Sequence, residues 1–181
     1  MSTLLTWRGL DEWRAESALV DRDERGLTAH GVQIGAGYRV DYRLRTDAAL
    51  VTRSLELSAL TAGGLRRLLL ERREEGVWTA DDRVVGEVEG ALDCDLALSP
   101  LTNFMPAARL GGEPADHVMA WVSVPDLVVS RSEQRYEPAG EGVVRYVGLD
   151  HEFSALLELD EAGFVTRYPG LAERVAPGSA A

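Results

Sequence analysis

Residues 38–45 read YRVDYRLR, and this strict alternation decides the fold class. Successive side chains of an extended strand point to opposite faces of a sheet, so alternation turns every second residue the same way. Here one face is apolar, with Tyr38, Val40, Tyr42 and Leu44, and the other face carries the charged residues. The stretch is therefore predicted to be a strand with one face buried and the other in water.

The same period recurs outward from this stretch. Strands are predicted at 51–57, 65–72, 77–78, 84–98, 128–136 and 143–148, and a hairpin over 153–168. A further strand is predicted at 117–124, which is apolar on both faces as a central strand would be. Helical turns are predicted only near Leu10–Ser17 and Pro106–Leu110. About ten strands separated by frequent turns predict an all-β, mainly antiparallel fold, either a strongly curved sheet or an incomplete β-barrel.

Length and composition suit one soluble domain. The 181 residues are 45% hydrophobic and 27% charged, close to the averages of globular proteins. Residues 1–175 are predicted to form a single β domain, and 176–181 a small polar tail that frays. The chain has no apolar run of about 18 residues, so no membrane span is expected. Its N-terminus does not read as a signal peptide, and a cytoplasmic location is expected.

The charge balance argues against nucleic acid as a partner. The chain has 30 acidic and 19 basic residues, and every basic residue is Arg. A net charge of −11 repels phosphate backbones, and no basic cluster reverses it. The missing Lys, with much Ala, Gly, Val and Leu, is typical of a GC-rich bacterial genome. The oligomeric state is not indicated.

No catalytic or cofactor motif is recognisable. His30, His117 and His151 lack the spacing of metal ligands, and Gly35-Ala-Gly37 is too short for a dinucleotide fingerprint. The single cysteine, Cys94, lies between two aspartates, which disfavour a reactive thiolate, so it is predicted to be a core residue. We expect no cofactor and no metal, and we assign no catalytic residue.

Three charged residues in predicted strands need an explanation. Asp93 and Asp95 alternate with Cys94, so their carboxylates share one face about 7 Å apart, which suits a hard cation or a sugar hydroxyl. We favour the alternative interpretation, a solvent-facing or structurally hydrogen-bonded pair. Arg53 falls on the apolar face between Val51 and Leu55, and a buried guanidinium needs a carboxylate or ligand oxygens.

The densest irregular stretch runs from Leu98 to Leu110. Pro100 and Pro106 stiffen it around Thr102 and Asn103, as in a rigid binding loop, although a structural crossover explains the pattern equally well. Arg109 ends this loop, and Arg53, Asp95 and Arg109 are predicted to bound one polar region at the mouth of the concavity. Trp78 and Trp121 are predicted to be core or cavity-wall residues.

Residues 95–110, DLALSPLTNFMPAARL, resemble the central signature of the bacterial putative glycolipid-binding family. Further pieces agree in order along nearly the whole chain: Trp7, Thr52-Arg53, Gly76-Val-Trp78, Trp121-Val-Ser-Val-Pro125, Gln134-Arg-Tyr136 and Gly163–Leu171. The resemblance implies a curved antiparallel sheet, similar in shape to lipoprotein and lipid carriers, and a lipid-like or glycolipid-like ligand. Ala108 and Ala172 depart from the Arg and the aromatic residue that the family tends to have there.

We therefore expect a non-catalytic binding protein for a lipid-like or glycolipid-like ligand. The candidate ligand-binding residues are Arg53, Trp78, Asp93, Asp95, Thr102, Asn103, Arg109, Tyr136 and Tyr168. Two alternatives stay open. One is a structural or interaction protein whose barrel core is filled by its own side chains, and the other is a carboxylate-dependent enzyme that uses Asp93 and Asp95.

Overall fold

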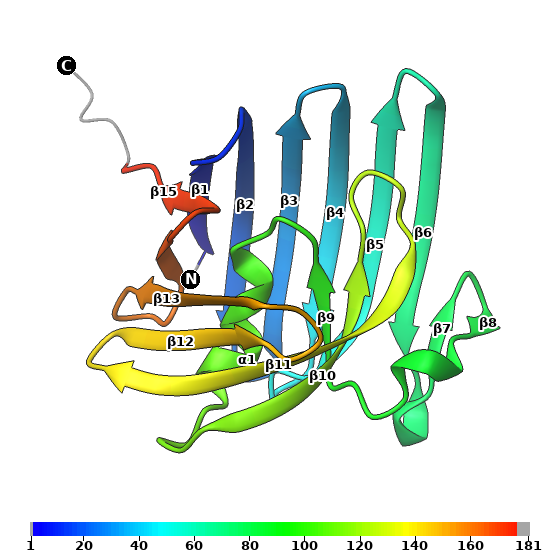
Figure 1. Ribbon diagram of the computed structural model, residues 1–181. Coiled ribbons are helices and arrows are strands. Elements are labelled where there is room, and N and C mark those ends of the chain that lie inside the picture. Colours follow the sequence, from blue (N-terminus) through cyan, green and yellow to red (C-terminus); the bar gives the residue numbers. More distant parts are fainter. Residues whose placement is uncertain (1, 177–181) are drawn as a thin grey trace.

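The computed structural model describes residues 2–176, which form one continuous sheet of 15 strands (Figure 1). The strands are β1 (Ser2–Gly9), β2 (Arg14–Asp23), β3 (Gly26–Gly35), β4 (Tyr38–Thr46), β5 (Thr52–Thr61), β6 (Gly64–Arg72), β7 (Trp78–Ala80), β8 (Arg83–Val84), β9 (Asp93–Leu96), β10 (Ala115–Val122), β11 (Val129–Gly140), β12 (Val143–Gly148), β13 (Phe153–Leu159), β14 (Val165–Tyr168) and β15 (Ala172–Arg174). The helices are short: η1 (Glu74–Gly76), η2 (Gly86–Val88), η3 (Leu101–Asn103) and α1 (Phe104–Ala108).

The strand order is that of a long meander. Strands β8 to β1 lie side by side in reverse sequence order, β15 then pairs with β1, and the sheet continues from β14 to β9. All pairs are antiparallel except β9 with β10. The two edge strands, β8 and β9, do not pair with each other, so the sheet is not closed into a barrel. The predicted all-β, mainly antiparallel fold with a strongly curved sheet is confirmed.

The two halves of the curved sheet face each other. In Figure 1, β2–β6 stand upright at the back, and β11–β13 cross in front of them at a steep angle. The helix α1 lies between these halves, where Ala107 packs against the apolar cluster formed by β11–β14.

Strands β9 and β10 are tucked inside this curve. On one of their faces, Cys94 and Ala120 belong to the same apolar cluster as Leu55 of β5 and Leu70 of β6. Their opposite face carries Asp95 and Trp121, and the strand register places these side chains on the same side of the sheet as Tyr136 of β11. The sheet is therefore an open roll, and its β9 edge lies inside the curve.

Side chains of the chain itself fill the roll. Trp7, Trp78, Phe104 and Tyr136 are among the largest fully buried residues, and the rings of Phe104 and Phe164 stack with centroids 4.3 Å apart. The core positions predicted for Trp78 and Cys94 are confirmed.

Several predicted element boundaries are wrong. No strand was expected before residue 38, yet β1–β3 lie there, and the helical turn predicted near Leu10–Ser17 is a bend followed by β2. The charged residues Arg14 and Glu16 occupy buried positions of β2, which hides its alternation. The strand predicted over 84–98 is interrupted by η2 and by a turn in which Gly90 adopts a φ of +85°.

Arg53 does not face the interior, contrary to the prediction. The register between β4 and β5 shifts here, with Arg45 opposite Ser54 and Thr46 opposite Thr52, so Arg53 is the extra residue of a β-bulge. The bulge reverses the phase of alternation and buries Thr52 instead. Arg53 lies at the surface, paired with Asp47 at 2.9 Å.

Two further expectations concern a membrane span and the C-terminal tail. No helix among residues 2–176 is long and apolar enough to cross a membrane. Almost all of the tail predicted to fray, residues 177–181, lies outside the described residues.

Candidate ligand-binding site

Three neighbouring strands bring polar and aromatic side chains to one face. The register places Asp95 of β9 beside Trp121 of β10, and Tyr136 of β11 beside Tyr146 of β12. Paired residues project from the same side of a sheet, so these side chains share the face that α1 partly covers.

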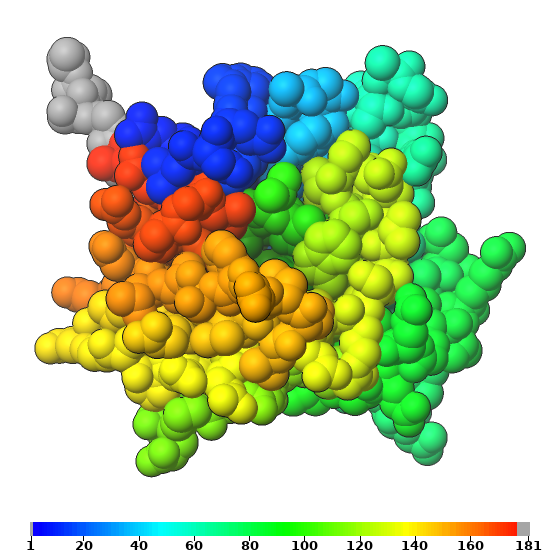
Figure 2. All heavy atoms as spheres, in the orientation of Figure 1, coloured from blue at the N-terminus to red at the C-terminus, as the bar shows by residue number. Residues whose placement is uncertain are grey.

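A cleft opens at one end of this face. It has a volume of about 340 Å³ and is lined by Asp95, Trp121, Ser130, Arg131, Ser132, Gln134, Tyr146, Asp150 and His151. A smaller hollow of about 110 Å³ shares Asp95, Trp121 and Tyr146, and adds Asn103, Tyr168 and Leu171 among others. In Figure 2, green atoms of the segment around residue 100 lie recessed between the blue β2, the yellow-green β10–β11 connection and the orange β13.

Asp95 lies between the cleft and the hollow. Its two carboxylate oxygens accept hydrogen bonds from Thr102 Oγ1 at 2.8 Å and from Gln134 Nε2 at 2.7 Å. Burial raises the pKa of Asp95, and these two hydrogen bonds oppose the shift. Among the described residues, no arginine or histidine forms an ion pair with it.

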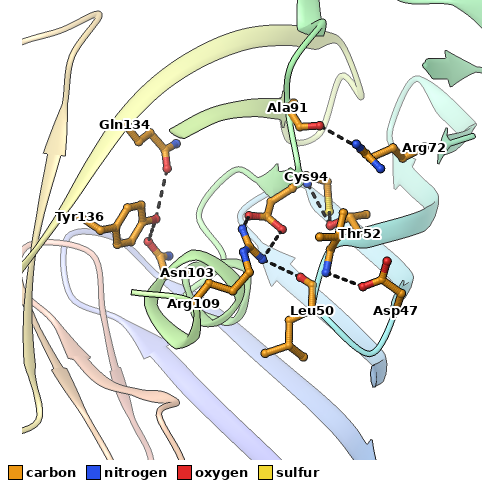
Figure 3. A network of polar contacts seen from close by, with 12 residues as sticks. Asp47, Leu50, Thr52, Arg72, Ala91, Cys94, Asn103, Arg109, Gln134 and Tyr136 are labelled. Carbon is orange, nitrogen blue, oxygen red and sulfur yellow. Dashed lines mark hydrogen bonds and ion pairs between the residues drawn. The ribbon is translucent and has the colours of Figure 1, made fainter. Parts of the chain in front are cut away.

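A second group of hydrogen bonds fixes the neighbouring polar side chains (Figure 3). The Tyr136 hydroxyl donates to Asn103 Oδ1 at 2.9 Å, and Asn103 Nδ2 donates to the Ser99 carbonyl at 3.2 Å. Burial raises the pKa of Tyr136, so its hydroxyl stays neutral and keeps its donor proton. The Leu98–Asn103 loop is thereby tied to β11.

The turn that begins this loop is backbone-strained. Leu98 adopts a φ of +66°, a left-handed conformation that costs a non-glycine residue about 1–3 kcal/mol. The following residue, Ser99, donates from its hydroxyl to Glu16 Oε1 of β2 at 2.7 Å. The turn therefore connects the cleft to the opposite half of the roll.

Glu16 was missed as a candidate. Its side chain is buried, accepts a hydrogen bond from the Tyr42 hydroxyl at 2.5 Å, and lies 3.4 Å from Gln33 Nε2. Burial raises its pKa to about 7. A signal was present in the sequence, because Glu16 alternates with the apolar Ala18 and Val20.

Asp93 and Arg109 form a separate ion pair outside the cleft lining. Arg109 holds both oxygens of the fully buried Asp93, with Nη1 3.0 Å from Oδ1, and it also donates to the Leu50 carbonyl at 2.7 Å (Figure 3). Burial raises the pKa of Asp93, and the Arg109 pairing opposes that shift. The Asp93 carboxylate is thus occupied within the protein.

The structure brings together some of the predicted site residues. Asp95, Thr102, Asn103, Tyr136 and Tyr168 line or support the cleft and the hollow. The others lie elsewhere: Arg53 is at the surface, Trp78 is in the core with its indole N–H donating to the Ala91 carbonyl, and Asp93 is paired with Arg109. The predicted polar mouth of Arg53, Asp95 and Arg109 is therefore not formed.

Sequence reasoning missed several cleft residues. Gln134, Tyr146, Asp150 and His151 lie in strands or hairpins far from Asp95 in the chain. Trp121 was predicted to be a core or cavity-wall residue, and its place in the cleft wall confirms this. Among residues 2–176, no group of three or more His, Cys, Asp or Glu side chains is arranged to hold a metal ion.

The fold and the cleft define an open, rolled antiparallel β protein with a mixed polar and aromatic site. The chain belongs to the family described as "Putative glycolipid-binding", whose model matches residues 4–174. It is similar to a DUF1089 family protein from Pseudomonas aeruginosa whose crystal structure is known, with 32% identity and a TM-score of 0.73. That match covers 97% of this chain and 91% of the other. No curated protein matches this chain.

Proposed function

We propose that this protein binds a glycolipid-like ligand without transforming it, and that the polar head of the ligand occupies the cleft around Asp95. The observation that carries the proposal is the composition of the cleft: Asp95, Gln134 and Ser132 supply hydrogen-bonding groups beside the rings of Trp121 and Tyr146. Apolar and aromatic walls with a few fixed polar groups are typical of small-molecule sites. The family description supports the same ligand class.

The filled interior restricts where an acyl tail can lie. The space between the two halves of the sheet is occupied by the core and α1, and the hollow beside Leu98 and Leu171 has only about 110 Å³. A long tail would therefore lie only partly in that hollow and continue over the surface, where Phe153 and Leu149 are exposed. Each methylene that is buried contributes about 0.8 kcal/mol, so a partly buried tail favours modest affinity.

Native mass spectrometry of protein purified from its own host tests the proposal. We expect a fraction of the protein to carry a co-purifying lipid with a sugar head, and Trp121→Ala to lose it because that side chain forms a cleft wall. Trp13→Ala is the matched control, since Trp13 is 70% exposed in the bend between β1 and β2. A protein that carries no lipid and takes up none from a bacterial lipid extract would refute the function.

The packed interior also supports a second candidate, a structural or interaction protein. Its core residues fill the roll as they would in a protein with no internal ligand. On that hypothesis, Trp121→Ala leaves every lipid measurement unchanged. We do not propose an enzyme built on the two aspartates, because both oxygens of Asp93 are held by Arg109.

A further inference from the structure

The cleft contains a carboxylate that no cation balances. Asp95 is hydrogen-bonded by Thr102 and Gln134, and both donors are neutral. Asp150 adds a second carboxylate at the rim, where it contacts His151 Nδ1 at 2.5 Å and the Glu133 N–H at 3.3 Å.

The nearby arginines have their charges engaged elsewhere. Arg131 lines the cleft, but it pairs with Glu133 at 2.9 Å and donates to the Glu89 carbonyl at 3.2 Å. Arg109 is held by Asp93 and the Leu50 carbonyl. The fixed charges around the cleft therefore sum to a negative value.

We propose that the head group bound in this cleft is an uncharged, hydroxyl-rich sugar and not a phosphate or sulfate. This inference rests on the proposed function and narrows its ligand class. A carboxylate only accepts hydrogen bonds, and each Asp95 oxygen, which accepts one bond from Thr102 or Gln134, can accept another. Sugar hydroxyls supply such a donor, and a dianionic phosphate does not. An anionic head would also lose its water beside a half-buried carboxylate of the same sign, an arrangement that suppresses binding.

The uncharged neighbours of Asp95 suit a sugar as well. Ser130 and Ser132 can each donate or accept a hydrogen bond, and the Gln134 amide presents both kinds of group. Trp121 and Tyr146 offer apolar ring faces on which the carbon-bound face of a sugar ring can pack.

Two amphiphiles with the same eight-carbon tail test the head-group class. n-Octyl β-D-glucoside and n-octyl phosphate are titrated below their micelle concentrations into the full chain at pH 7 by isothermal calorimetry. We expect the glucoside to bind at least about tenfold more tightly, because like charges oppose the phosphate. The glucoside affinity should change little between low and high salt, since no charge is screened.

Variants test whether Asp95 causes the preference for the glucoside over the phosphate. Asp95→Asn keeps the shape of the side chain but removes its charge. It should lower the affinity for the glucoside by about fivefold or more and reduce the difference in affinity between the glucoside and the phosphate. Asp116→Asn is the control, because Asp116 is exposed, pairs with Arg135, and points to the opposite face of β10 from Trp121. Circular dichroism of each variant checks that the fold is kept, and Trp121→Ala gives a second variant of the same site.

The possible failures are distinguishable. Tighter or equal binding of the phosphate, or an unchanged preference in Asp95→Asn, overturns the sugar-head inference and leaves the proposed function standing. Binding of neither amphiphile also counts against the inference. In that case the native mass spectrometry of the host-purified protein decides separately whether the proposed function falls as well.

Discussion

Arg109 and Arg53 each pair with an aspartate, but the two pairs differ in burial. The Asp93 side chain is 0% exposed and Arg109 18%, whereas Arg53 is 49% exposed beside Asp47. Removing one partner of a buried pair leaves an uncompensated charge, so Arg109→Ala should lower the free energy of unfolding by about 3–5 kcal/mol. Arg53→Ala should cost less than about 1 kcal/mol. Urea denaturation of both variants checks this, and equal losses would contradict the assignment.

Glu16 should make stability depend on pH. Its pKa is about 7 in the folded protein against 4.5 as the ordinary value, so between these values the native state holds a proton that the unfolded chain has released. Stability should therefore fall as pH rises from about 4.5 to about 7, by up to about 3 kcal/mol, and then level off. The charged or titratable groups facing Glu16 are Tyr42 and Arg14, and Ser99 and Gln33 are its neutral neighbours.

The isosteric variant Glu16→Gln tests this dependence. Because the amide does not titrate, the variant should lose less stability than the wild type between pH 5 and pH 8 in urea unfolding experiments. Glu161→Gln, in an exposed turn, should behave as the wild type does. The hypothesis fails if Glu16→Gln keeps the full pH dependence of the wild type.

From the residues alone, contacts between site residues were predictable only where the chain itself brings them together, and Tyr136 and Tyr168 were named because they lie in pieces that carry the family resemblance. Asp95, Thr102 and Asn103 lie within one short segment, and their contacts follow from that proximity. Gln134 and Tyr146 reach Asp95 through strand pairing, which depends on hydrogen-bond register and not on any local pattern. The ion-pair partners of Arg53 and Arg109 likewise depend on the fold.

Among the elements, alternation located strands whose buried faces are purely apolar. The predicted bounds of β12 and β13 agree with the structure, and those of β4 and β6 differ from it by one residue each. Alternation failed for β2, where Arg14 and Glu16 are buried, and at Arg53, where one bulge residue reverses the faces. A buried polar group keeps the period of two but hides the apolar face, and a bulge shifts the phase of the period. The spacing of Glu16 with Ala18 and Val20 was therefore a usable signal, whereas the bulge at Arg53 left none in the alternation.

The packing of β2, β3 and β4 depends on a glycine. Tyr42 of β4 crosses Gly31 of β3 to reach Glu16 of β2, and a Cβ atom at position 31 would lie 2.2 Å from the Tyr42 ring. Gly31→Ala should therefore displace Tyr42 and destabilise the protein by about 1–3 kcal/mol. Thermal and urea unfolding measure the loss.

Gly111→Ala is the matched control for this prediction, because no atom beyond the adjoining residues lies within 4 Å of the position its Cβ would take. Its effect should stay within about 0.5 kcal/mol. If Gly31→Ala is equally harmless, Tyr42 has room to move, and the contact with Glu16 does not require the glycine.

At the scale of the whole molecule, the roll is held by a seam between β5 and β9. The Thr52 N–H donates to the Leu92 carbonyl at 3.1 Å. The Cys94 N–H donates to Thr52 Oγ1 at 3.1 Å (Figure 3). Both Thr52 and Cys94 are 0% exposed. The seam joins β5 to the edge strand β9 of a sheet that is not closed, so weakening it should make it easier for β9 to leave the roll.

Cys94 can report the opening of this seam. Its thiol is buried, and burial raises its pKa, so a thiol-specific reagent should reach it only when the roll opens. Thr52→Val keeps the volume but leaves the buried Cys94 N–H without an acceptor, at a cost of about 1–3 kcal/mol. If opening is in fast equilibrium, this cost corresponds to labelling about 5- to 150-fold faster in native buffer.

Thr52→Ser separates the hydrogen bond from the packing, since it retains the hydroxyl and loses only a methyl group. It should label more slowly than Thr52→Val, although faster than the wild type. Comparison of each labelling rate with the unfolding free energy from urea then shows how the molecule opens. Labelling faster than global unfolding allows means that β9 leaves the roll while the rest of the sheet stays folded. Equal labelling of all three proteins would show that the Thr52 hydroxyl does not hold the roll together.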